Sequence, residues 1–249
     1  MQVLKLLLLL IIFSSQYSAQ ELITDRPDQT ESAVTVPLHS LQIETGFAYE
    51  SLKENGFSFR NYTVAGTLFR YGLIKNIELR FGTGYLISEA NETISGFGDF
   101  LFGGKINFLI EEQSGLDFGL LIHTALPIGD ETLNPNKFEP ELIAALSKSL
   151  SENFSISFNF GGSHNSSIEE IIYVYTGALG ISLSEELSAF AELYGNFSKT
   201  FSPLHNFDGG FTYLLSDTVQ LDISGGKGIT GIGSYWFISS GVSLRIDNL

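Results

Sequence analysis

The sequence predicts an all-β protein, an antiparallel transmembrane up-and-down β-barrel of about twelve strands. Three observations support this prediction. Apolar and polar residues alternate along most of the chain, and the alternation recurs about every 18 residues. The connections between these segments are alternately short and long. Because successive side chains of a strand point to opposite faces, the pattern gives a wall with one apolar face.

Residues 1–19 have the pattern of a signal peptide. Lys5 provides a positive start, and Leu6–Phe13 is an apolar run too short to span a bilayer. Small and polar residues then lead to an expected cleavage site after Ala19. We therefore expect export from the cytoplasm and a mature chain that begins at Gln20.

The mature chain divides into an N-terminal part and a barrel. We expect residues 20–38 to form a periplasmic segment or a plug of the lumen, and residues 39–249 to form the barrel. The barrel region contains about twelve alternating segments, most of them long enough to cross a bilayer as a tilted strand. The predicted strands are 39–50, 59–70, 76–88, 97–109, 115–127, 138–150, 153–164, 171–183, 187–199, 205–215, 219–226 and 234–246.

A soluble β-sandwich has the same alternation with its apolar face inward, so further features are needed to favour a membrane. Charged residues at the positions that alternate with the apolar ones lie in mid-strand beside glycines, as expected for side chains that face a water-filled lumen. Two charged residues, Arg70 and Lys148, occupy positions of the apolar face. Both lie near segment ends, where the free-energy cost of a lipid-facing charge is lowest. Aromatic residues also collect at strand ends, as they do at membrane interfaces; examples are Tyr49, Tyr85 and Trp236.

The connections differ between the two ends of the predicted barrel. Those after even-numbered segments are short: 111–114, 151–152, 184–186 and 216–218. Those after odd-numbered segments are mostly longer and richer in Gly, Asn and Pro: 51–58, 89–96, 128–137, 165–170, 200–204 and 227–233. Outer-membrane barrels have short periplasmic turns and longer external loops, so both chain termini are expected in the periplasm.

Composition limits the possible partners. The chain carries 13 basic and 28 acidic residues and no cysteine, with a formal net charge of −15. Phosphate binding needs a basic surface, so we exclude nucleic acid as a partner. Without cysteine there are no disulfides and no thiolate ligands, and the histidines lack metal-ligand spacing. We expect no metal and no cofactor, and outer-membrane lipid as the surroundings; the oligomeric state is left open.

Charged residues on the polar, lumen-facing side of the predicted strands are the first candidates for function. Two interpretations stay open: ion pairs that fill a narrow barrel, or a pore whose acidic majority attracts cations and disfavours anions. The predicted luminal charges are Glu44, Glu78, Arg80, Asp99, Lys105, Asp117, Glu139, Glu141, Glu192, Asp208, Asp222 and Arg245.

A compact charged stretch precedes the first strand: Asp25, Arg26, Pro27, Asp28 and Glu31. A flexible tether would be richer in Gly and Ser, whereas this composition suits fixed pairing. We therefore favour a plug folded into the lumen over a periplasmic tether. In this plug, Arg26 meets luminal acids, and the acids of the stretch meet Arg80, Lys105 or Arg245.

His164 and Ser166 are the strongest candidates for catalysis. Outer-membrane lipid hydrolases place a histidine and a serine two residues apart, so that the base and the nucleophile share one strand face. Here, however, Gly161 and Gly162 are expected to end the strand, and the next segment offers no Asn to orient the base. A polar loop is the alternative, and we expect no enzyme.

Several stretches can be compared with a known family: Ile23–Ser32, Val36–Pro37, Leu41–Phe47, Gly96–Asp99 with Lys105, and Thr124–Gly129. They resemble outer-membrane transporters labelled as a putative phenol meta-cleavage (MetA) pathway of phenol degradation. The resemblance in layout covers the whole mature chain, and the first stretch is its most specific part. It implies a barrel that passes small molecules, aromatic ones among them, and it assigns no binding residue.

Together these features predict a porin-like outer-membrane channel for passive uptake of small solutes, hydrophobic or aromatic compounds included. Its location would be a Gram-negative outer membrane, reached after signal-peptide export. Two alternatives stay open. One is an outer-membrane lipid hydrolase that uses His164 and Ser166, and the other is a structural or adhesive barrel with a filled lumen.

Overall fold

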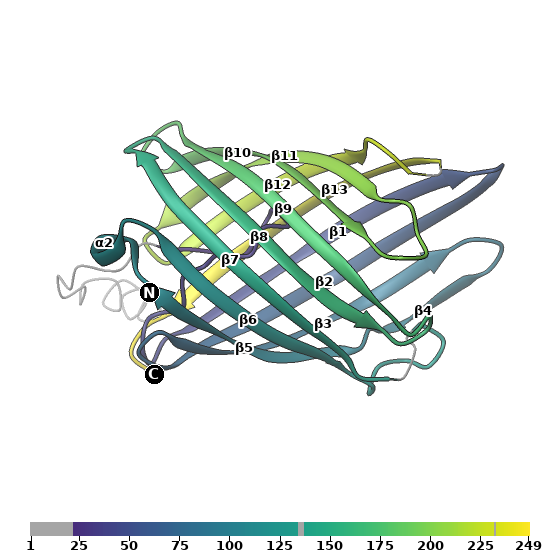
Figure 1. The fold of residues 1–249 in the computed structure, drawn as a ribbon, viewed down its shortest axis with the longest axis horizontal. Helices are drawn as coiled ribbons and strands as arrows, with labels where there is room; N and C mark the ends of the chain where they lie inside the picture. Colours follow the sequence, from purple (N-terminus) through teal and green to yellow (C-terminus); the bar gives the residue numbers. More distant parts are fainter. Residues whose placement is uncertain (1–21, 134–136, 232) are drawn as a thin grey trace, which may run out of the picture.

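The protein is a closed β-barrel (Figure 1). The computed structural model describes residues 22–133, 137–231 and 233–249, so the predicted signal peptide at residues 1–19 lies outside the described residues. The strands are β1 (Leu41–Glu54), β2 (Phe57–Ile74), β3 (Ile77–Glu89), β4 (Thr93–Phe97), β5 (Phe100–Leu109), β6 (Asp117–Leu126), β7 (Glu139–Ser151), β8 (Phe154–Asn165), β9 (Glu170–Ser182), β10 (Leu187–Phe197), β11 (Leu204–Ser216), β12 (Val219–Gly228) and β13 (Ser234–Ile246). A short helix, α2 (Glu111–Ser114), connects β5 to β6. None of the helices in the described residues has the length and apolar character needed to cross a membrane.

Hydrogen bonds join the strands into one sheet of 13 strands in which every neighbouring pair is antiparallel. β4 and β5 both pair with β3 and are two pieces of one crossing, interrupted at Gly98 and Asp99. β13 pairs with β1 and β2 pairs with β3, so the sheet closes on itself. The predicted barrel of 12 strands is confirmed. Closure matters because an open sheet edge would leave backbone groups without partners in lipid.

The two faces of the wall have opposite chemistry, as the alternation predicts. Large apolar side chains are exposed on the outer face, for example Phe158 at 51% and Ile122 at 56%. Polar and charged side chains are buried on the inner face, among them Glu44 at 1% and Asn159 at 4%. A water-soluble protein has the reverse arrangement, whereas lipid covers the outer face of a membrane barrel. The distribution therefore fits a barrel that lies in a membrane.

The prediction that Arg70 faces lipid is wrong, because β2 contains a β-bulge. The register of β2 shifts against both β1 and β3 around Ala65, which has a φ of 50°. One extra residue reverses the face to which every later side chain of the strand points. Arg70 therefore points into the lumen, where its exposure is 0%.

Two predicted external loops are mostly strand. β1 and β2 continue through the expected loop at 51–58 and are joined by Asn55 and Gly56, both with positive φ. An Asn-Gly pair with two positive φ values is the favoured two-residue turn of a hairpin. The expected loop at 89–96 contains β4, which pairs with the end of β3. At the other end of the barrel the connections are short, as predicted, for example between β11 and β12.

Lipid exposure along β8 leads to a first prediction. Phe158 lies within the strand and Phe154 at its start, and both are exposed on the outer face. We predict that Phe158→Arg destabilises the barrel by about 2–4 kcal/mol and Phe154→Arg by about 0–1 kcal/mol, because an arginine near the interface can reach water. Urea unfolding in lipid vesicles measures both variants. Equal losses at the two positions would contradict a membrane-spanning β8.

Candidate functional site

Residues 22–38 lie inside the barrel, and we call them the luminal segment. They precede β1, and their purple trace runs within the barrel near the end where the C-terminus lies (Figure 1). The segment forms no helix or extended strand, so its backbone groups need partners from the wall. It is hydrogen-bonded to side chains of β1, β2, β3, β5, β8, β9, β10, β12 and β13. Its contacts therefore extend around most of the lumen.

Backbone N–H groups of the luminal segment donate to side chains of the wall. These bonds replace the ladder that a strand would provide, and they fix the path of an otherwise irregular chain. The pairs, with the N–H donor first, are Asp25 to Glu44 at 3.0 Å, Gln29 to Glu192 at 2.7 Å, Glu31 to Asn159 at 2.6 Å and Val36 to Glu78 at 2.8 Å.

Six buried charged side chains, which we call the ionic cluster, join the luminal segment to β1, β2, β3 and β5: Asp25, Glu44, Arg70, Glu78, Arg80 and Lys105. No member exposes more than 3% of its side chain. The carboxylate of Asp25 lies 3.1 Å from Arg70 Nη1 and 3.1 Å from Lys105 Nζ, and it also accepts from Arg80. Three acids face three bases among these six residues, and Glu31 of the luminal segment adds a partly exposed fourth acid against Arg80.

Arg70 holds the wall side of the ionic cluster together. Its Nη1 lies 2.9 Å from Glu44, and its Nε lies 3.0 Å from Glu78. It also donates to the backbone oxygen of Val34 in the luminal segment. Strict alternation along the strand placed Arg70 on the lipid face and so missed it as a site residue. A charged residue at a position expected to be apolar was the sign in the sequence that the strand contains a bulge.

Arg26 leaves the luminal segment in another direction and pairs with Asp222 of β12. Its Nε and Nη2 lie 3.1 Å and 2.9 Å from the two carboxylate oxygens, and Nη2 also donates to Ser239. The guanidinium lies against Gly46 and Gly241, which are paired in β1 and β13. A Cβ at either position would lie 2.5 Å from Arg26, so both positions require glycine while Arg26 keeps this place.

Glu31 accepts two hydrogen bonds from Nη2 of Arg80, at 2.8 Å and 3.0 Å. Two acids of the luminal segment thus meet Arg80, and Asp25 also meets Lys105. Arg245, the third expected partner, pairs with Asp247 at 2.8 Å. The structure thus brings three predicted residues, Asp25, Glu31 and Glu78, into contact with Arg80, while the role of the segment as a plug stays a prediction.

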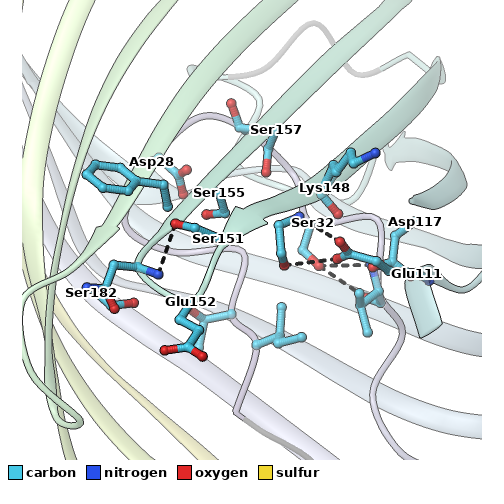
Figure 2. Close-up of a pocket in the computed structure, with 18 residues that line it drawn as sticks. Asp28, Ser32, Glu111, Asp117, Lys148, Ser151, Glu152, Ser155, Ser157 and Ser182 are labelled. Carbon is cyan, nitrogen blue, oxygen red and sulfur yellow. Dashed lines mark hydrogen bonds between the residues drawn. The ribbon is translucent and has the colours of Figure 1, made fainter. Parts of the chain in front are cut away.

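Asp28 lines a cavity of about 340 Å³ at the end of the barrel where β7 meets β8 (Figure 2). No salt bridge among the described residues includes Asp28. Asp117, Glu111 and Glu152 also line this cavity, together with a group of hydroxyl side chains: Thr24, Thr30, Ser32, Ser147, Ser149, Ser151, Ser155, Ser157 and Ser182. The cavity therefore offers hydroxyl and carboxylate oxygens to a polar molecule.

Asp99 lies at the external end of the barrel, in the break between β4 and β5. It accepts a hydrogen bond from the N–H of Gly129 at 3.1 Å, and the N–H of Asp130 donates to Phe97 at 2.8 Å. The hydroxyl and the N–H of Thr132 both donate to Asp130, and these hydrogen bonds lower the pKa of Asp130 below its ordinary value. Asp99 thus ties the loop after β6 to the wall and lies outside the ionic cluster.

Asp117 lies at the start of β6 and also stands apart from the ionic cluster. It accepts from the N–H of Glu111 at 3.1 Å and from the side chain of Asn107 at 3.4 Å. Farther along the wall, His123 lies 3.6 Å from Glu141. Within the described ranges, no group of three or more His, Cys, Asp or Glu side chains is arranged to hold a metal ion.

His164 and Ser166 do not form the arrangement that the hydrolase alternative needs. Ser166 is buried, and its hydroxyl donates to Glu139 at 2.7 Å. His164 is partly exposed, and its Nε2 lies 3.7 Å from Glu169. β8 ends at Asn165, so Ser166 lies in the following turn, where the alternation of a strand no longer applies. The geometry brings the serine to a carboxylate of β7 and not to His164.

Comparison with known families agrees with this architecture. Residues 24–246 match the family described as "Putative MetA-pathway of phenol degradation". The chain belongs to this family. The match begins in the luminal segment and continues to the end of β13, so the family covers both the segment and the barrel. A comparison with curated proteins found no match.

Solved structures share the barrel fold at low identity. An outer membrane channel from Pseudomonas putida F1 has a TM-score of 0.68 at 13% identity, covering 86% of this chain and 98% of that chain. The NanC porin has a TM-score of 0.53 at 10% identity, with 83% and 100% covered. The translocator domain of the autotransporter NalP from Neisseria meningitidis has 0.53 at 8%, with 85% and 90% covered. These likenesses establish the outer-membrane barrel fold, and function has to be argued from the site.

The balance of the ionic cluster leads to a second prediction. Asp25→Asn should destabilise the barrel by about 3–5 kcal/mol, because buried Lys105 then keeps only Glu78, at 3.8 Å, as a counter-charge. Asp28→Asn is the matched control in the same segment. It removes a carboxylate without a basic partner and should cost less than about 1 kcal/mol. Urea unfolding in vesicles compares the two, and similar losses would contradict a specific role for Asp25.

Proposed function

We propose that the protein is an outer-membrane channel for passive uptake of small solutes, with the luminal segment as its plug. The observation that carries this proposal is the position of the segment, which crosses the lumen between two hollow regions. Family membership and the similar channel from Pseudomonas putida F1 support a transport role. A barrel that serves only as a rigid structure gains nothing from these cavities, since protein interiors otherwise pack closely.

The cavity on the external side supports small, largely apolar solutes. It has a volume of about 580 Å³. Leu68, Leu86, Leu101 and several glycines form much of its wall, and Glu44, Asp99 and Glu139 also line it. Binding sites for small molecules typically have volumes of about 300–1,000 Å³ and mostly apolar walls. Arg26 also lines this cavity, so a solute that enters from outside meets the luminal segment directly. Hydrophobic and aromatic compounds fit this description, in agreement with the family label.

The charge of the lumen supports neutral and cationic solutes over anions. Acids outnumber bases among the buried luminal side chains. The cavity of about 340 Å³ beside Asp28, which we call the inner cavity, is lined by four acids, Asp28, Asp117, Glu111 and Glu152, and by one base, Lys148. Acidic rings and cavities lower the local concentration of anions. We therefore place organic anions last in the order of permeation.

The proposed location is the outer membrane. The similar solved structures are outer-membrane barrels, which supports this location. Export through a signal peptide at residues 1–19 is part of the proposal, as is outer-membrane lipid around the apolar outer face. Small solutes passing through the lumen are the proposed partners.

A structural barrel with a filled lumen is the second candidate. The ionic cluster favours it, because a buried and balanced set of charges holds the luminal segment firmly. Conductance of the intact protein separates the two candidates, since only a channel passes current while the luminal segment is in place.

We predict that deletion of residues 24–32 increases single-channel conductance several-fold in planar bilayers, because it removes the contacts that cross the lumen. A variant with the same residues in scrambled order is the control for length and composition. Unchanged conductance and unchanged stability after the deletion would contradict a plug.

Solute selectivity leads to a further prediction. In liposome swelling, a neutral aromatic solute should permeate faster than a carboxylate of the same size, because the external cavity is apolar and the lumen is acidic. The difference should shrink at high salt, where charge is screened. Equal rates for the two solutes at low salt would contradict the proposed selectivity.

A further inference from the structure

We propose that the lumen binds a small, hard metal cation between Glu192 of β10 and Asp208 of β11, and that calcium matches this site best. The two residues are paired directly opposite each other in the β10–β11 register. Glu192 is 1% exposed and Asp208 is 0% exposed. This inference rests on the geometry of the wall and does not require that the barrel conducts.

Neither carboxylate has a basic partner. Among the described residues, no salt bridge includes Glu192 or Asp208, and both carboxylate oxygens of Asp208 are buried without a hydrogen-bond donor. Other buried acids of the lumen do pair with Arg or Lys: Asp25, Glu44, Glu78 and Asp222. A buried carboxylate is unfavourable unless it binds a cation or takes up a proton. Asp208 is thus the luminal acid with the strongest need for a cation.

The luminal segment adds charge and oxygen atoms beside this pair. Asp28 directly precedes Gln29, whose N–H donates to Glu192 at 2.7 Å. The hydroxyl of Thr30 donates to Glu192, and the hydroxyl of Thr176 lies 2.6 Å from that of Thr30. Carboxylate, hydroxyl and water oxygens are the ligands that calcium prefers, in sets of about six to eight. Several like charges without a base favour a divalent over a monovalent ion.

The direct ligands come from the wall. In the part of the chain that the structure describes, three carboxylates do not converge on one point. We therefore assign Glu192 and Asp208 as direct ligands, water as the remaining ligands, and Asp28 as a neighbouring charge. Glu192 also accepts hydrogen bonds from Gln29 and Thr30, so the bound ion would stiffen the contact between β10 and the luminal segment. This contact lies across the lumen from β3 and the ionic cluster.

Calorimetry on the purified barrel in detergent, after treatment with a chelator, tests the site. We expect one calcium ion per barrel with a Kd on the order of 10⁻⁴–10⁻³ M, and a higher Tm when calcium is present. Asp208→Asn should weaken calcium binding by more than about tenfold. It should also raise the Tm of the chelator-treated protein, because it removes an unpaired buried charge. Glu139→Gln removes a luminal acid from another wall and should leave calcium binding unchanged.

Two results would overturn the proposal. The first is a wild-type barrel that binds no calcium; a gain in stability on acidification would then assign a shared proton to the two carboxylates. The second is equal calcium binding by the wild type and Asp208→Asn, which would place the ion elsewhere. Neither result involves solute flux, so a failure here is distinguishable from a failure of the channel proposal.

Discussion

The charge of Asp25 is the constraint on which the arrangement inside the barrel depends. Arg70, Arg80 and Lys105 are buried in the wall, and the strands provide only Glu44 and Glu78 against them within the cluster. The missing negative charge comes from the luminal segment. Because an uncompensated buried charge costs several kcal/mol, the segment is part of the electrostatic balance of the barrel. This explains why residues without secondary structure keep a single path through the lumen.

The bulge in β2 makes this balance possible. A regular strand would direct Arg70 toward lipid and leave Glu44 and Glu78 without their shared partner. The positive φ of Ala65 costs on the order of 1–3 kcal/mol for a residue with a Cβ. Leaving a buried charge unpaired costs about 3–5 kcal/mol, so the local strain is the smaller cost. The fold thus tolerates one unfavourable backbone angle in exchange for a buried ion pair.

Alternation predicted the barrel, its two faces and its short connections, because lipid imposes one simple rule on every strand. The same rule failed at Arg70, because one inserted residue reverses the face to which the later side chains point without interrupting the strand. It also failed at 51–58, where β1 and β2 extend as a hairpin to a turn that Asn55 and Gly56 signal locally. The composition of the luminal segment predicted that its charges pair. Their partners could not be predicted, because strands far apart in sequence together determine which charges meet.

The two sides of the luminal segment are held with unequal strength, and this has a consequence for the proposed plug. On one side, Asp25 lies within the ionic cluster, with a side chain that is 3% exposed. On the other side, Arg26 makes a single ion pair, is 21% exposed and lines the external cavity. Pro27 and Asp28 border a further cavity of about 230 Å³, so this part of the chain has free space beside it. Partly exposed pairs contribute less than buried ones. A plug anchored at Asp25 would therefore yield first at residues 26–28, which lie between the external and inner cavities.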